Sequence, residues 1–453
     1  MKKRAISGIL VIILLISAMT VAFAENENKE EKPENEVQEV FSADSPYAIL
    51  IDMKTGIVLY EKNSTQRVYP ADLTKIMTAV LVLENCKLEE LVTVSESAIL
   101  NVSTGDSNLG IIKEEKLSVR QLLYAMLLGS AADATNALAE NTSGSIENFV
   151  SLMNEKAAKL GMKNTHFTNP TGSHDERHYT TAQDMAKLAS YAMEIPEFSE
   201  IVKCDSYSIP ATEKCATARK VVNRNHFVSN LLRNDYYYKY STGIKTGYSV
   251  EAKSCIAASA IKGNVSLIAL VFGAETVENV AQSFKDCKNL FDAAFSNYSN
   301  HIVVEGNEII AQTEVTNTRR NSKLLLKTDK AISVLKLKNS ENPDITFKDE
   351  YPARISAPVK KGQIIGTREY FVDGITVGKI NLISDRDYAL DPISYIFNKI
   401  MAFIKSPWLF VCIFLLIFVF IMLERRRRRI LRKKRRAQRE KRRKMMEEEF
   451  SKM

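Results

Sequence analysis

An uninterrupted apolar run, Trp408 to Leu423, lies near the C-terminus and constrains this chain more than any other feature. With Pro407, a helix over this run would be about 26 Å long, just enough to cross a bilayer. Glu424 and then Arg425–Arg429 follow it, with further basic clusters beyond. Dense Lys and Arg beside a span mark the cytoplasmic side of a membrane. The sequence therefore predicts a transmembrane helix over 407–423, a basic cytoplasmic tail over 424–453 and a body outside the cell membrane.

The N-terminus has the pattern of a secretory signal. Three basic residues, Lys2 to Arg4, precede a mostly apolar stretch from Ala5 to Val21. Ala22-Phe23-Ala24 is a small-x-small cleavage site, so a signal peptide over 1–24 is predicted. The alternative is a retained transmembrane anchor. Residues 25–43 are acidic and polar, which predicts a disordered tether.

The net charge of the chain is unevenly distributed. The total is +8, but the tail from Glu424 contributes +11 and the first basic cluster contributes +3, which leaves −6 between them. A mildly acidic body predicts no nucleic-acid surface. The basic tail could in principle bind nucleic acid, but beside a membrane span we expect it to contact anionic lipids.

Cysteine and histidine residues predict neither a metal site nor a cofactor. Cys412 lies in the predicted span, and the other five cysteines are an odd number, so at least one is unpaired within a monomer. No C-x-x-C or His-rich spacing of metal-ligand type occurs. Disulfide pairing stays open.

Alternating helix and strand patterns occupy the first half of the chain and predict one domain over 44–297. Residues 302–383 differ, because short apolar clusters alternate with polar turns there. This predicts a small all-β domain over 298–390. Tyr395–Lys405 is predicted to be an amphipathic lead-in to the span. In the first domain, strands are predicted at 47–52, 57–60, 243–248, 255–260 and 265–272, and helices from about 71, at 119–128, 133–141, 146–160, 181–193 and 277–296.

Three short motifs, with the stretches around them, carry a family resemblance. Asp72-Leu73-Thr74-Lys75, Ser130-Ala131-Ala132 and Lys245-Thr246-Gly247 follow one another along the first domain. In this order and context the chain resembles the serine D-alanyl-D-alanine carboxypeptidases, the low-molecular-mass penicillin-binding proteins. That family has S-x-x-K on a helix, S-x-N in a loop and K-T-G on a strand. Further stretches are also similar to the family: 45–52, 152–157 with 160–162, 169–172 with 178–182, and 357–362.

The resemblance implies a fold and a mechanism. The fold is α/β, a penicillin-binding-protein/β-lactamase-like domain with a central antiparallel sheet and flanking helices, followed by a small all-β domain and a C-terminal transmembrane helix. In the mechanism, a hydroxyl at position 72 attacks the substrate with Lys75 as its base. Ser130 shuttles protons, while Lys245, with Thr246 and Gly247, binds the terminal carboxylate of a stem peptide ending in D-Ala-D-Ala. Penicillin mimics that dipeptide.

Two positions depart from the family pattern. Asp72 stands at the nucleophile position and Ala132 at the position of the S-x-N amide. Attack by a carboxylate would give a labile anhydride, and Asp72 would repel the substrate's own carboxylate. We also expect Asp72 to pair with Lys75, which opposes the role of that amine as a base. Other S-x-x-K matches, at 259–262 and 333–336, lie in strand-like stretches where this spacing separates the two groups.

The motifs also have structural interpretations. An Asp at a helix start commonly caps the helix, and Lys-Thr-Gly alone can mark a turn. Three functions are therefore weighed. The first is a catalytically impaired carboxypeptidase homologue that binds stem peptides or partners and, non-covalently, β-lactams. The second is a working D,D-carboxypeptidase with unusual chemistry, and the third is a non-enzymatic interaction protein of the cell envelope.

Overall fold

The computed structural model describes residues 40–233, 235–277, 280–319, 322–340 and 342–450, which divide into two compact units. The first unit contains residues 40–301 and Ser333–Asn342, and the second contains Ile302–Ile332 and the chain from Pro343. The predicted signal peptide and residues 25–39 of the predicted tether lie outside the described residues. The predicted end of the tether at residue 43 is wrong, because Phe41 is buried and its ring packs near those of Tyr60 and Tyr298.

The first unit is built on a five-stranded antiparallel sheet. Its inner strands β8 and β9 are rich in Ala, Ile, Leu and Val and are buried over most of their length, as expected for strands covered on both faces. Strand β7 forms one edge of the sheet. The spatial order is β2 (Val58–Lys62), β1 (Tyr47–Asp52), β9 (Val265–Ala274), β8 (Lys253–Lys262) and β7 (Ser241–Ser249).

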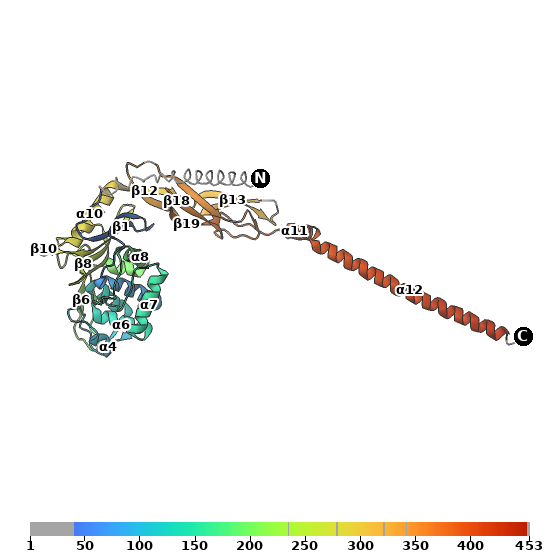
Figure 1. Ribbon diagram of the computed structural model, residues 1–453, viewed down its shortest axis with the longest axis horizontal. Helices are drawn as coiled ribbons and strands as arrows, with labels where there is room; N and C mark the ends of the chain where they lie inside the picture. The colour runs from blue at the N-terminus through green and yellow to red at the C-terminus, as the bar shows by residue number, and fades with distance from the viewer. Residues whose placement is uncertain (1–39, 234, 278–279, 320–321, 341, 451–453) are drawn as a thin grey trace, which may run out of the picture. The chain divides into compact units, whose positions relative to one another are not determined.

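Helices cover both faces of this sheet. Successive side chains of a strand point to opposite faces, and the strands carry apolar side chains on both, so each face is buried by helices. Ile49 and Ile51 belong to the larger hydrophobic cluster, together with residues of α3, α5, α6 and α8, whereas Ala48 and Leu50 belong to a second cluster with α10. Figure 1 shows this unit with α10 apart from the group formed by α6, α7 and α8. The helices are η1 (Ala71–Thr74), α3 (Lys75–Asn85), α4 (Glu96–Leu100), α5 (Val119–Gly129), α6 (Ala132–Ser143), α7 (Ile146–Lys159), α8 (Ala182–Met193), α9 (Pro196–Lys203) and α10 (Gln282–Asn297).

Several element boundaries differ from the prediction. The helix expected from residue 71 opens as the 3₁₀ turn η1 and becomes α-helical only at Lys75. The helix expected from residue 277 begins at Gln282, because a two-stranded ribbon precedes it. The ribbon strands are β3 (Leu91–Thr93), β4 (Lys116–Ser118), β5 (Ser206–Ile209), β6 (Arg219–Val222), β10 (Thr276–Val277), β11 (Val280–Ala281), β12 (Tyr298–Val304) and β15 (Ile332–Leu337). Helices α4 and α9 and the ribbons formed by β3 with β4, β5 with β6 and β10 with β11 were not predicted, since they are too short for a clear period, whereas β12 and β15 contain apolar clusters of the stretch predicted as all-β.

The second unit contains a six-stranded sheet, which confirms the small all-β domain. Its hydrophobic core includes Val315, Leu324, Leu326 and Leu382. The return segment Ser333–Asn342 falls inside the predicted boundaries of this domain but belongs to the first unit. In spatial order the strands are β16 (Ile345–Glu350), β18 (Ile364–Val372), β19 (Ile375–Ser384), β14 (Ser322–Thr328), β13 (Ile309–Thr316) and β17 (Arg354–Ser356).

Two helices follow that sheet. Helix α11 (Pro392–Ile404) is capped by Asp391, whose Oδ2 accepts a hydrogen bond from the Ser394 N–H at 2.9 Å. Helix α12 (Pro407–Phe450) continues through the arginine run, so the predicted span and much of the predicted tail form one long helix (Figure 1). Within the described part of the chain, α12 is the one helix that is long and apolar enough to cross a membrane. Its composition fits a transmembrane anchor.

Candidate active site

The first motif lies where the chain turns from η1 into α3. Ala71 has a φ of +46°, which a residue with a side chain seldom adopts. Gly172, with a φ of +85°, packs directly against this turn: a Cβ at that position would lie 1.9 Å from the carbonyl oxygen of Ala71. Only glycine fits so close an approach. The turn that presents position 72 is therefore held by a neighbouring loop as well as by its own helix.

Asp72 and Lys75 form an ion pair across one turn of this helix start. The Lys75 side chain is only 1% exposed, whereas that of Asp72 is 29% exposed. The Lys75 ammonium also donates to the carbonyl oxygen of Thr171 at 2.7 Å. The ion pair expected from the three-residue spacing is thus present. Its lysine is buried, and its carboxylate is partly exposed to solvent.

Ser130 and Lys245 form the second pair of the site. Ser130 ends α5 with a φ of +62°, a left-handed conformation that commonly marks a constrained functional position when the residue is not glycine. Its Oγ accepts a hydrogen bond from the Lys245 Nζ at 2.7 Å. Both residues are buried. The structure therefore brings together side chains that are 115 positions apart in the sequence.

Ala132 begins α6 and is fully buried. Its N–H donates to the carbonyl oxygen of Ser107 at 2.7 Å. The next residue, Asp133, accepts hydrogen bonds from the N–H groups of Leu109 and Ile111, which fixes the loop beside Ser107. The position thus has an ordered backbone, and its methyl side chain cannot offer the hydrogen bonds of an asparagine amide.

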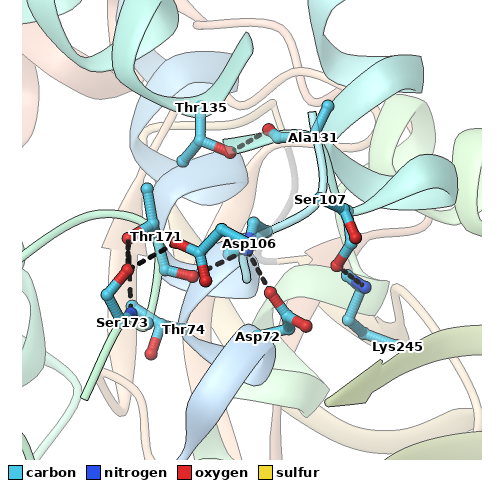
Figure 2. A network of polar contacts seen from close by, with 12 residues as sticks. Asp72, Thr74, Asp106, Ser107, Ala131, Thr135, Thr171, Ser173 and Lys245 are labelled. Atoms are coloured by element: carbon cyan, nitrogen blue, oxygen red, sulfur yellow. Dashed lines mark hydrogen bonds and ion pairs between the residues drawn. The ribbon is translucent and has the colours of Figure 1, made fainter. Parts of the chain in front are cut away.

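Strand β7 carries the intact Lys-Thr-Gly sequence at the edge of the sheet. Lys245 Nζ donates to the carbonyl oxygen of Thr246 at 3.0 Å. A Cβ on Gly247 would lie 3.0 Å from the backbone nitrogen of Asp72, so glycine lets β7 approach η1 closely. Figure 2 shows Asp72 and Lys245 next to each other, with Thr171 and Ser173 on the other side of Asp72.

Opposite charges set the electrostatics of the site. Burial alone would raise the pKa of Asp72, but the nearby Lys75 and Lys245, with hydrogen bonds from Lys75 and Ser130, hold this pKa below its ordinary value. Burial lowers the pKa of Lys245 to about 7, against the opposing attraction of Asp72 and with added repulsion from Lys75 and Arg224. At neutral pH, Asp72 is therefore ionised and Lys245 is only partly protonated.

Sequence reasoning missed several polar residues around this site. Ser173 Oγ donates to Asp106 at 2.6 Å, and Arg224 donates to Ser107 Oγ at 2.5 Å. Beneath η1, Thr74 Oγ1 lies 2.9 Å from Nε2 of the buried His178. Asp106 and Ser107 lie in a long loop without periodicity, so no sequence signal marks them. Across the described residues, no group of three or more His, Cys, Asp or Glu side chains could hold a metal ion, and all six cysteines are free thiols.

The α/β fold of the first unit and the separate all-β domain define a penicillin-binding-protein-like class of protein. The chain belongs to the D-alanyl-D-alanine carboxypeptidase family of cell-wall metabolism, whose sequence pattern matches residues 31–276. The pattern of the penicillin-binding protein 5 C-terminal domain matches residues 298–389.

Individual relatives agree with this assignment. The D-alanyl-D-alanine carboxypeptidase DacF of Bacillus subtilis is 36% identical over 392 residues, which cover 85% of this chain and 94% of that protein. The carboxypeptidase DacA of Haemophilus influenzae is 33% identical over 74% of this chain and 82% of its own length. Among solved structures, penicillin-binding protein 5 of Haemophilus influenzae is similar with a TM-score of 0.59 and 28% identity, covering 77% of this chain and 98% of that one.

Proposed function

We propose that this chain is a catalytically silent member of its family, which binds peptidoglycan stem peptides without hydrolysing them. One observation carries the proposal: a carboxylate, Asp72, stands at the nucleophile position and is ion-paired with Lys75. The identity of the other site residues argues for retained recognition. Ser130, Lys245, Thr246 and Gly247 have the residue types that the family uses around its substrate.

The chemistry of a carboxylate opposes turnover. A hydroxyl can be deprotonated and can form a stable ester with the substrate's acyl group, whereas a carboxylate would form an anhydride. Lys75 is already paired with Asp72 and bonded to Thr171, so its amine is not arranged as a free base. Ala132 lacks the amide that would orient the substrate. These features together support loss of acyl transfer rather than a substitute mechanism.

The retained strand side supports binding. Lys245 lies on β7 and donates to Ser130, and β7 is an edge strand, whose outer backbone can pair with an extended peptide. We expect stem peptides ending in D-alanine to lie along this edge and β-lactams to bind there without forming a covalent bond. In this role the protein is a binding or scaffolding module in cell-wall assembly, without a cofactor or a nucleic-acid partner.

The function is tested on the full chain in nanodiscs. Release of D-alanine from a stem pentapeptide is measured beside binding of the same peptide by calorimetry, with the Bacillus subtilis relative as a positive control for release. We expect binding without release. Steady release of D-alanine would contradict the proposed absence of hydrolysis. Absence of binding would contradict the proposed role in binding stem peptides.

The proposed topology follows from α12. We propose that the first 24 residues are a signal peptide, that residues 407–423 span the cell membrane, and that the basic part of α12 lies in the cytoplasm beside anionic lipids. Protease added to intact protoplasts should remove the body and spare an epitope tag at the C-terminus. Digestion of the tag together with a protected body would contradict this orientation.

A further inference from the structure

We propose that the site formed by Asp72, Ser130 and Lys245 prefers stem peptides whose C-terminal carboxylate is blocked, as an amide or in a cross-link, over peptides that end in a free carboxylate. This inference rests on the proposed function, because it concerns the ligand class of the same site. The Lys-Thr-Gly sequence alone would indicate a ligand with a free terminal carboxylate, and the proposed preference differs from that.

The first argument is the location of the negative charge. Asp72 acts electrostatically on both Lys75 and Lys245, the two buried lysines of the site. A ligand carboxylate anchored at Lys245 would therefore share that cation with a carboxylate of the protein. Two like charges near one cation repel each other.

The second argument is exposure. Asp72 retains 29% of its side-chain surface, while the Lys75 side chain retains 1% and Lys245 is 2% exposed. An entering ligand thus meets the carboxylate before it meets either ammonium group. A neutral amide can donate a hydrogen bond to the Asp72 carboxylate, whereas a second carboxylate cannot.

The third argument is the state of the cations. Lys245 already donates to Ser130 and to the carbonyl oxygen of Thr246, and its pKa of about 7 leaves it partly uncharged at neutral pH. Arg224, which also acts on Lys245, donates to Ser107. The two lysines that act on Asp72 are thus engaged within the protein, which weakens either one as an anchor for an incoming anion.

The test compares two peptides that differ only at the C-terminus. Diacetyl-L-Lys-D-Ala-D-Ala with a free carboxylate and the same peptide as its C-terminal amide are titrated into the full chain in nanodiscs. We expect the wild type to bind the amide at least about ten-fold more tightly. Asp72→Asn keeps the shape of the side chain and removes its charge, so this preference should disappear or reverse.

Asp205→Asn is the matched control, since Asp205 is exposed and the same charge is removed outside the site. It should leave the preference unchanged. Equal affinities, or tighter binding of the free carboxylate by the wild type, would overturn the inference while leaving stem-peptide binding in place. If neither peptide binds the wild type or a folded Asp72→Asn protein, the proposed function falls, and the inference falls with it.

Discussion

The two sides of the proposed site differ in how far they keep the residue types that the family resemblance leads one to expect. On the strand side, β7 keeps Lys245, Thr246 and Gly247, and Lys245 is hydrogen-bonded to Ser130. On the helix side, Asp72 and Ala132 depart from the expected residues. Under the proposed function, recognition and acyl transfer are separable on this fold, because the strand side keeps its residues while a carboxylate stands at the proposed nucleophile position.

Backbone packing explains why the departures leave the fold intact. Gly172 and Gly247 approach η1 so closely that a side chain on either would meet the backbone of Ala71 or Asp72. These contacts depend on the backbone of the turn and not on the side chain at position 72. A hydroxyl can therefore be exchanged for a carboxylate without moving the turn.

Repair of the helix side should have the largest effect on this comparison. Asp72→Ser alone places a hydroxyl one turn before Lys75, and we expect slow acylation by penicillin. Adding Ala132→Asn restores an orienting hydrogen bond worth roughly 1–3 kcal/mol, so the double variant should acylate about ten-fold faster or more. The measurement is the second-order acylation rate of the wild type, both single variants and the double variant.

The repair experiment can also break the comparison. Equal rates for Asp72→Ser and the double variant would mean that Ala132 is not a missing orienting group. No acylation in a folded double variant would mean that the site differs from an active one in more than these two side chains.

Gly172→Ala tests whether the backbone holds the helix side. The added Cβ would lie 1.9 Å from the Ala71 carbonyl oxygen, so we expect a loss of about 2–4 kcal/mol in the free energy of unfolding. Gly144→Ala is the matched control, because Gly144 has a similar φ of +81° but open space around its missing Cβ. Chemical denaturation should show the smaller loss for the control. Equal losses would mean that the contact with Ala71 does not matter.

His178 should make the helix side sensitive to acid. Burial lowers its pKa to about 4, and the Thr168 N–H donates to its Nδ1, so Nε2 carries the proton shared with Thr74. The unfolded chain takes up a proton below about pH 6.5 that the folded chain excludes, so stability is full above that pH and falls toward pH 4. At pH 5 the expected loss is about 2 kcal/mol. Denaturation of His178→Gln across this range should show a flatter pH dependence, and an unchanged slope would contradict the assignment.

Lys253 should have the smallest effect. It begins β8 with a φ of +54°, which a residue with a side chain seldom adopts. Lys253→Gly should relieve that strain and raise the free energy of unfolding by about 0.5–1 kcal/mol, less any contribution of the exposed ion pair with Glu275. Lys253→Ala removes the pair and keeps the strain, so it should be less stable than Lys253→Gly. The reverse order would show that the conformation is not strained.

Much of the fold could be predicted because its signals are local and strong. The apolar runs at residues 255–260 and 265–272 predict strands, and the periodicity of α5, α7 and α8 predicts helices, whereas the predicted strand at 243–248 contains the Lys-Thr-Gly sequence. The predicted helix start at residue 277 is wrong because a β-ribbon competes with the start of α10. The tether prediction fails at Phe41 because one of its ring partners, Tyr298, lies far along the chain.

The site was predictable only where a motif marks it. Lys75, Ser130 and Lys245 were named from the sequence, and the structure places them together with Asp72. Asp106 carries no such mark, since its contact with Ser173 joins two irregular loops. The lowered pKa of Lys245 could not be predicted either, because it depends on complete burial.

The central claim is the absence of acyl transfer at Asp72, and intact-protein mass spectrometry tests it most directly. The full wild-type chain is incubated with excess benzylpenicillin and its mass is compared with that of the untreated protein, with the Bacillus subtilis relative treated in parallel. Our account predicts an unchanged mass for this chain. A stoichiometric penicilloyl adduct, mapped to any residue, would contradict it.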